Sequence, residues 1–191
     1  MAMKTIADKQ VLVGADFAGL SLKNAVVDFL KTNGWTVTDV GVTDPDDPDP
    51  LMFHRVGLRV GAMVGNGEFE RALIFCGTGM GIHVAASRSP HVRAAVCESV
   101  PSALRAVTAN DCNILAMGAF YVAPKTGIAM ADAFLNHRLG DGYEAWDQFY
   151  EYHKFACDEV EAFDFDSFVA GGYQFTAPQP YLGPQPKDMT I

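Results

Sequence analysis

Short apolar runs alternate with segments of helical period between residues 11 and 135 of this chain. The apolar runs occupy residues 11–14, 35–40, 72–76, 93–97 and 114–117. The helix-period segments occupy residues 22–30, 53–64, 82–88, 102–109 and 125–135. Short buried strands that each lead into a helix are typical of a parallel sheet covered on both faces. We therefore predict a three-layer α/β/α sandwich with a five-stranded parallel, Rossmann-like sheet, which binds ligands at the carboxyl ends of its strands.

The composition changes at about residue 143. Residues 143–155 are aromatic and acidic, and residues 168–191 are rich in glycine and proline. This segment has too little regular pattern to fold alone, so we expect a helix followed by an extended tail, docked on the body or on a partner subunit. The chain is accordingly divided into an α/β domain, residues 1–142, and a C-terminal extension, residues 143–191.

Charge and cysteine content narrow the class of protein. The formal net charge is -9, and the 14 lysines and arginines form no basic stripe, which argues against a nucleic-acid or anionic-membrane partner. No apolar run is long enough to span a membrane, and the five histidines lack the spacing of metal ligands, so we predict no metal. Four cysteines without a C-x-x-C pair or an apolar leader predict reduced thiols in a cytoplasmic protein.

The strongest functional motif is CGTGMG at residues 76–81, where a predicted strand ends and a helix begins. The three glycines let the backbone approach a ligand closely. The amides of residues 78–81 would form an anion-binding concavity at the helix start, suited to a phosphate, a carboxylate or an enediolate oxygen. Cys76 would then be a reacting group. The alternative is a tight strand-to-helix turn that holds a buried, inert thiol.

Two further features are candidates for the edge of a site. The acidic, proline-rich segment 44–50 is predicted to be a surface loop, either at the rim of the site or only as a solvated connector. His83 follows the glycine loop by one helical turn, so it is either a site acid or base, or a half-exposed helix residue.

Several ordered motifs are similar to one known family. They are VGADFAG at 13–19, CGTGMG at 76–81, RAAVC at 93–97 and NDCNILAMG at 110–118. Over residues 8–142 the chain resembles the ribose-5-phosphate isomerase B / galactose-6-phosphate isomerase family. The resemblance implies a parallel α/β sandwich that interconverts aldose and ketose phosphates without metal or organic cofactor. It also implies a homodimer or tetramer with shared active sites.

The resemblance assigns roles to individual residues. Cys76 would be the base that moves a proton between C1 and C2, and Thr78 would assist proton movement between the substrate oxygens. Asp16 would hold sugar hydroxyls, and Asn110 would be a polar ligand. The remaining loop residues that would line the substrate pocket are Gly77, Gly79, Met80 and Gly81. Asp16 as a helix cap, Thr78 as a turn residue and Asn110 as a structural side chain are the alternatives.

Departures from the family pattern bear on the substrate. Phe17 and Ala109 occupy the positions of two histidines that bind and open the sugar ring, which suggests an open-chain substrate such as a four-carbon sugar phosphate. Phe120, Tyr143 and Asp147 align with the family's phosphate-binding arginines. A sugar without phosphate, bound by the aromatic C-terminal region, is therefore a second hypothesis.

Two function classes remain open at this stage. The first is an aldose–ketose isomerase with an altered substrate range. The second is a non-catalytic sugar-binding or regulatory paralogue that has kept the pocket. Retention of Cys76, Thr78 and the glycines favours the enzyme, because a protein that only binds sugar has no evident need for a thiol in this loop.

Overall fold

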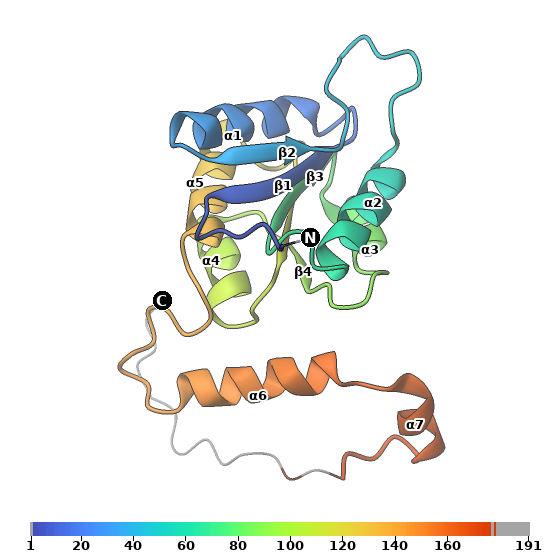
Figure 1. Cartoon of the computed structure of the whole chain (residues 1–191), viewed down its shortest axis with the longest axis vertical. Coiled ribbons are helices and arrows are strands. Elements are labelled where there is room, and N and C mark those ends of the chain that lie inside the picture. The colour runs from blue at the N-terminus through green and yellow to red at the C-terminus, as the bar shows by residue number, and fades with distance from the viewer. Residues whose placement is uncertain (1, 177, 179–191) are drawn as a thin grey trace.

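The computed structural model describes residues 2–176 and 178, so the predicted extended tail lies largely outside the described residues, at positions 177 and 179–191. The sheet has five strands in the order β2-β1-β3-β5-β4, and every neighbouring pair is parallel. The strands are β1 (Gln10–Ala15), β2 (Thr36–Asp39), β3 (Ala72–Cys76), β4 (Ala94–Val96) and β5 (Ile114–Gly118). The predicted five-stranded parallel sheet is confirmed (Figure 1).

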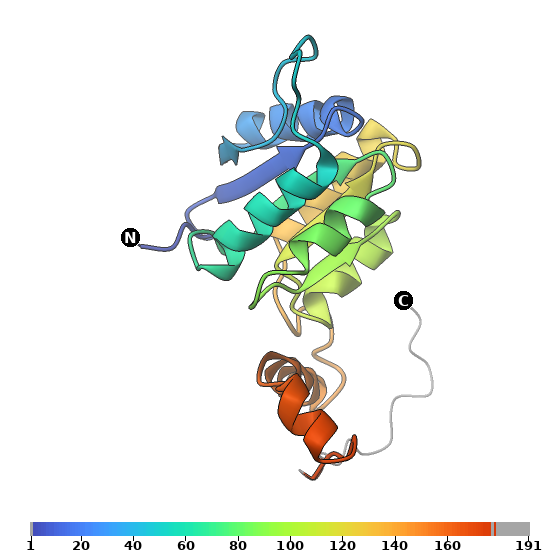
Figure 2. The same ribbon diagram turned by 90° about the vertical axis from the view of Figure 1, so that its right-hand side faces the viewer.

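Helices cover both faces of the sheet, as Figures 1 and 2 show. One face carries α1 (Leu20–Thr32), α4 (Val100–Thr108) and α5 (Pro124–Leu135), and the other carries α2 (Phe53–Gly65) and α3 (Met80–Ala86). Alternate residues of β3 belong to the two resulting cores: Leu73 and Phe75 to the first, Ile74 and Cys76 to the second. This period of two places the Cys76 side chain on the α2/α3 face.

Helix α3 begins two residues earlier than the predicted segment 82–88. Gly79 precedes it with φ +76°, in the left-handed region that glycine adopts without steric cost. The chain therefore turns sharply at Gly79 and enters the helix at Met80. The glycine spacing suggested a longer loop, whereas a single left-handed residue completes the reversal.

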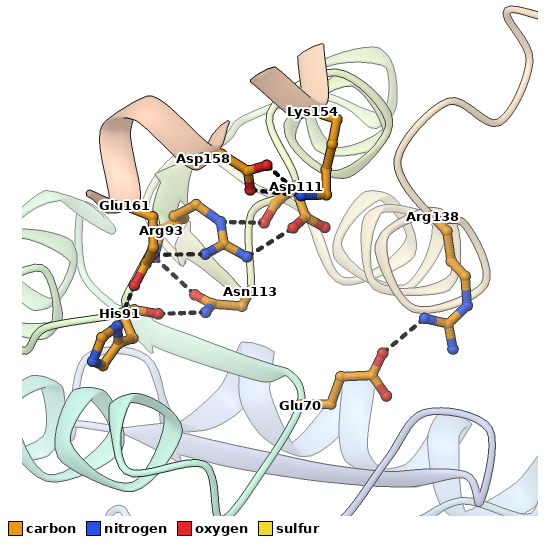
Figure 3. A network of polar contacts seen from close by, with 9 residues as sticks. All are labelled: Glu70, His91, Arg93, Asp111, Asn113, Arg138, Lys154, Asp158 and Glu161. Atoms are coloured by element: carbon orange, nitrogen blue, oxygen red, sulfur yellow. Dashed lines mark hydrogen bonds and ion pairs between the residues drawn. The ribbon is translucent and has the colours of Figure 1, made fainter. Parts of the chain in front are cut away.

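Helix α6 (Phe149–Glu161) and the short α7 (Phe165–Ala170) form the described part of the extension. In Figures 1 and 2 they lie below the sandwich, beyond the amino ends of the strands. Arg93, just before β4, donates to the carboxylate of Glu161 at 3.2 Å, and the His91 ring also contacts this carboxylate (Figure 3). Phe149 is the one fully buried residue of α6. Tyr152, Ala156 and Cys157 are half-buried on the side of α6 that faces the body.

Two glycines on α2 allow this helix to pack closely on α3. A Cβ at Gly57 would lie 2.5 Å from the carbonyl oxygen of Ile82, and one at Gly61 would lie 2.5 Å from that of Ala86. Both obstacles are backbone atoms, which cannot rotate away. The α2/α3 layer, which carries the Cys76 face of the sheet, therefore depends on glycine at both positions.

We predict that Gly61→Ala lowers the stability of the fold by about 1–3 kcal/mol, because its methyl group would force α2 away from α3. In a free helix the same change stabilises by about 1 kcal/mol, so the predicted sign is opposite to that of helix propensity. Thermal unfolding followed by circular dichroism measures the effect. Leu58→Ala, an exposed position on the same helix, is the matched control and should shift the midpoint little. An unchanged or raised midpoint for Gly61→Ala would contradict the packing argument.

Candidate active site

The candidate site lies between the carboxyl ends of β1 and β3. In the sheet, β1 lies between β2 and β3. The connection that follows β1 leads to β2 on one side, and the connection that follows β3 leads to β4 on the other side, so the two connections run in opposite directions. In open α/β sheets this topological switch point is where ligands bind. Asp16 follows β1 directly, and its amide donates to the carbonyl of Phe75 at 3.2 Å. The fold therefore brings Asp16 and Cys76, predicted from separate motifs, to adjacent strand ends.

Cys76 is the last residue of β3, and only 4% of its surface is exposed. The amide of Gly79 donates a hydrogen bond to its sulfur at 3.1 Å. The thiolate is the form of cysteine that abstracts a proton, and an N–H group in this position can also donate to a thiolate. The left-handed turn at Gly79 thus supplies an electrostatic partner for this thiol.

The rest of the loop offers further polar groups. The Thr78 hydroxyl oxygen accepts the Met80 amide at 3.3 Å. Within the described part of the chain, the amides of Gly77 and Thr78 donate to no protein acceptor. These two amides are free for a ligand oxygen, which is the kind of donor that stabilises an oxyanion.

The other three thiols have environments that hold them protonated. Burial raises the pKa of Cys112 to about 12, with a smaller contribution from nearby Cys97. Burial likewise raises the pKa of Cys97 and that of Cys157. Cys97 and Cys112 are core residues. The direct amide contact therefore distinguishes Cys76 as the candidate nucleophile or base.

Asp16 is half-buried, and burial raises the pKa of its carboxyl group; hydrogen bonds from backbone amides, foremost that of Gly19, partly oppose this shift. Its Oδ1 atom accepts the Gly19 amide at 2.9 Å, just before α1 begins. Asp16 thus has the turn-stabilising contact expected of a structural residue. It also lies at the carboxyl end of β1, beside the end of β3.

Aromatic rings frame the glycine loop, a feature that the sequence motifs did not indicate. A Cβ at Gly77 would lie 2.5 Å from the ring of Phe120, and a Cβ at Gly81 would lie 2.6 Å from the ring of Phe53. Phe120 is 70% exposed, and Phe17, beside Asp16, is 59% exposed. The sequence could have pointed to these rings only through their positions, because each follows a predicted strand or starts a predicted helix at the carboxyl edge of the sheet.

Two candidate residues lie away from Cys76. Asn110 is exposed between α4 and β5, at the amino edge of the sheet, and its amide nitrogen contacts the Arg105 carbonyl at 3.4 Å. A single chain therefore does not bring Asn110 to Cys76. The His83 ring contacts the carbonyl of Ala94 at 3.1 Å, on the side of β4, so it does not supply an acid or base to the loop.

Features of two other kinds of protein are absent among the described residues. No helix among them is both long and apolar enough to cross a membrane. Nor do they gather three or more His, Cys, Asp or Glu side chains in a group that would hold a metal ion.

Comparison with known proteins identifies similar chains. The family model of ribose/galactose isomerases matches residues 11–148. A 4-deoxy-4-sulfo-D-erythrose isomerase from Clostridium sp. (strain MSTE9) is 38% identical over 155 residues, which cover 81% of this chain and 95% of that protein. A D-erythrulose-4-phosphate isomerase from Pectobacterium atrosepticum is 32% identical over 135 residues, covering 71% of this chain and 88% of that protein.

The fold is also found in solved structures. The ribose-5-phosphate isomerase B of Clostridium thermocellum superimposes with a TM-score of 0.69 at 29% identity, covering 86% of this chain and 99% of that chain. The family match spans the switch point, the glycine loop and all five strands. The chain therefore belongs to the ribose/galactose isomerase family of sugar-phosphate isomerases.

Proposed function

We propose that this aldose–ketose isomerase acts on an open-chain, four-carbon sugar that carries a phosphate or sulfonate group at C4. The observation that carries the proposal is the thiol of Cys76, which accepts the Gly79 amide at the switch point beside Asp16. Relatives named for four-carbon substrates, a 4-deoxy-4-sulfo-D-erythrose isomerase and a D-erythrulose-4-phosphate isomerase, support the substrate class.

The proposed reaction is a proton transfer through an enediolate. The Cys76 thiolate removes the proton from C2 of the aldose, and the carbonyl oxygen on C1 takes up the negative charge. The free amides of Gly77 and Thr78 stabilise that oxygen. The thiol then returns the proton to C1, while the Thr78 hydroxyl relays a proton from O2 to O1. Every atom is retained, and the product is the ketose.

The absence of two family histidines fits an open-chain substrate. A four-carbon aldose closes into a furanose only through its C4 hydroxyl, and a phosphate or sulfonate at C4 removes that hydroxyl. Such a substrate needs no residue to open its ring. Phe17 and Ala109 therefore remove a function that this substrate does not require.

The anionic group of the substrate needs positive charge near the site. Arg55 and Lys125 lie in the first turns of α2 and α5, which both begin at the carboxyl edge of the sheet. Both side chains are exposed, and helix N-termini also favour negative charge. We assign these two residues as the cations available to a C4 phosphate or sulfonate.

The complete site is proposed to form between two copies of the chain. Asn110, at the amino edge of one sheet, would reach the Cys76 loop of a partner. Two apolar surfaces are open for such an interface. The carboxyl edge exposes Phe17, Met52, Phe53, Met80, Phe120 and Tyr121; the extension exposes Tyr150, Val160, Phe163, Phe165, Val169, Tyr173 and Phe175. Exposed aromatic patches of this kind mark association surfaces, so the extension 143–191 is assigned a docking role.

A cytoplasmic location is proposed on the basis of the thiols. All four cysteines are unpaired, which is typical of a reducing compartment.

Deuterium exchange in D2O, followed by NMR, tests the isomerase directly. We expect deuterium uptake beside the carbonyl of erythrose 4-phosphate or 4-deoxy-4-sulfoerythrose, at a higher rate than with ribose 5-phosphate. Cys76→Ala should reduce the rate by a factor of about 10²–10⁴, as for loss of a general base. Cys157→Ala on α6 is the matched control and should keep full activity. Ligand binding without any uptake would instead identify a non-catalytic paralogue.

Asp16→Asn should separate stability from activity. The amide keeps an oxygen for the Gly19 amide but removes a carboxylate whose charge is disfavoured by burial, so the unfolding midpoint should stay equal or rise. Activity should fall about tenfold, because a charged acceptor binds hydroxyls more strongly than a neutral one.

The pH dependence provides a second check on Asp16. Its pKa is raised above the ordinary 3.8, so in the acid range the folded state binds more protons than the unfolded state. Wild-type stability should thus gain from this group as pH falls through its raised pKa, while activity declines. Asp16→Asn should lack both trends. If the activity of the two proteins declined identically as pH falls, Asp16 would be excluded from the site.

Subunit complementation tests the shared site. Cys76→Ala and Asn110→Ala should each be inactive alone, because each lacks one half of the site. Mixed dimers would contain one intact site, so co-refolded variants should regain up to about a quarter of wild-type activity on statistical mixing. Gel filtration provides the oligomeric state. No recovery from a confirmed mixed dimer would show that each chain forms its site alone.

A further inference from the structure

A cavity of about 500 Å³ lies at the amino ends of the strands, opposite the Cys76 loop. Its volume falls within the range of small-molecule sites, about 300–1,000 Å³. Four basic side chains line it, Arg71, Arg93, Arg138 and Lys154, together with two carboxylates, Glu70 and Asp111. This surplus of positive charge contrasts with the net charge of -9 of the whole chain.

Three of these cations are already neutralised by carboxylates, as Figure 3 shows. Arg93 pairs with Asp111 at 2.8 Å, and Arg138 pairs with Glu70 at 2.9 Å. Lys154 pairs with Asp158, its neighbour on α6. The second oxygen of Glu70 accepts the Ile6 amide at 2.9 Å, so that carboxylate is fully engaged.

Arg71 differs from the other three. It lies directly before β3 and is 4% exposed, although its side chain lines the cavity. Its Nη1 atom donates to the carbonyl of Phe134 in the last turn of α5, and its guanidinium lies 5.2 Å from the centre of the Phe134 ring. Among the described residues, no carboxylate oxygen lies within 4.0 Å of Arg71. A guanidinium has five N–H donors, and among the described residues Arg71 makes no other side-chain hydrogen bond, so its remaining donors are available to a ligand.

The Phe134 carbonyl at the end of α5 compensates only part of the buried positive charge of Arg71. A helix C-terminus carries a partial negative charge, which explains one contact of Arg71. Burial nevertheless lowers the pKa of Arg71 to about 10, against the opposing effect of nearby Glu70. A bound anion would reverse this shift, because an opposite charge favours the protonated guanidinium.

We propose that this cavity binds a small anion bearing a phosphate, sulfonate or carboxylate group, with Arg71 as its principal ligand and Arg93 and Arg138 at its rim. The planar fork of a guanidinium matches the paired oxygens of such groups. Asn113 also lines the cavity, but its side chain is already engaged: Oδ1 accepts the Arg93 amide at 2.9 Å, and Nδ2 donates to the His91 carbonyl at 2.8 Å. The proposal concerns the cavity around Arg71 at the amino edge of the sheet and does not rest on the proton transfer proposed for Cys76.

Thermal unfolding with inorganic phosphate tests the site. At about tenfold excess over its Kd, phosphate should raise the midpoint of the wild-type protein by about 3–6 °C relative to chloride of equal ionic strength. Arg71→Met should lose this increment, whatever its own midpoint. Arg59→Met is the matched control: Arg59 also donates to a backbone carbonyl, that of Val40 at 3.0 Å, but lies outside the cavity. Arg59→Met should retain the full phosphate increment.

Cys76→Ala, which changes the opposite edge, should also retain the increment. An increment that survives in Arg71→Met and disappears in Cys76→Ala would place phosphate at the glycine loop and overturn the proposal, as would no increment in the wild type. If Arg71→Met fails to fold, side-chain NMR of the wild-type arginines replaces it. The Nε–Hε resonance of Arg71 should then shift on phosphate addition while that of Arg59 stays in place; an unmoved Arg71 resonance would refute the site.

Discussion

The hydrogen bond from the Gly79 amide to the Cys76 sulfur depends on a chain reversal that the surrounding sheet holds in place. Gly79 adopts φ +76°, and the loop lies directly against the end of β5, where a Cβ at Gly118 would be 2.5 Å from the Thr78 carbonyl. At this point the loop rests on the backbone of β5. A rigid support of this kind fixes donors before substrate binds, which is what electrostatic stabilisation of an enediolate requires.

The two edges of the sheet carry different kinds of group. At the carboxyl edge, strand ends and helix starts bring together a thiol, free amides, a half-buried carboxylate and exposed aromatic rings. At the amino edge, ion pairs connect the strands to the extension, and one arginine is buried beside a cavity. Parallel topology causes this separation, because all strands point the same way and every following helix returns to the opposite edge.

Sequence patterns predicted the positions of the helices and strands better than the strand order or the burial of individual side chains. The apolar run at 72–76 matches β3 because a strand buried on both faces tolerates no polar residue. The start of α3 was misplaced, since the pattern does not show which glycine turns left-handed. Strand order was not predicted, because it depends on where connections cross the sheet. Arg71 gave no signal either: basic side chains are normally exposed, and its burial arises from α5 packing over the start of β3.

In the proposed mechanism proton transfer and anion binding take place at separate ends of the substrate, which would let the family site serve a shorter substrate. In the proposed mechanism Cys76 and Thr78 would act only on C1, C2 and their oxygens, so they would be needed whatever the chain length. The anionic group lies at the other end of the substrate, and its position changes with each carbon removed. The ring of Phe120 lies against Gly77, at a position where the family resemblance suggests an arginine. A four-carbon substrate would place its anionic group elsewhere on the rim, where α2 and α5 begin and where Arg55 and Lys125 are exposed.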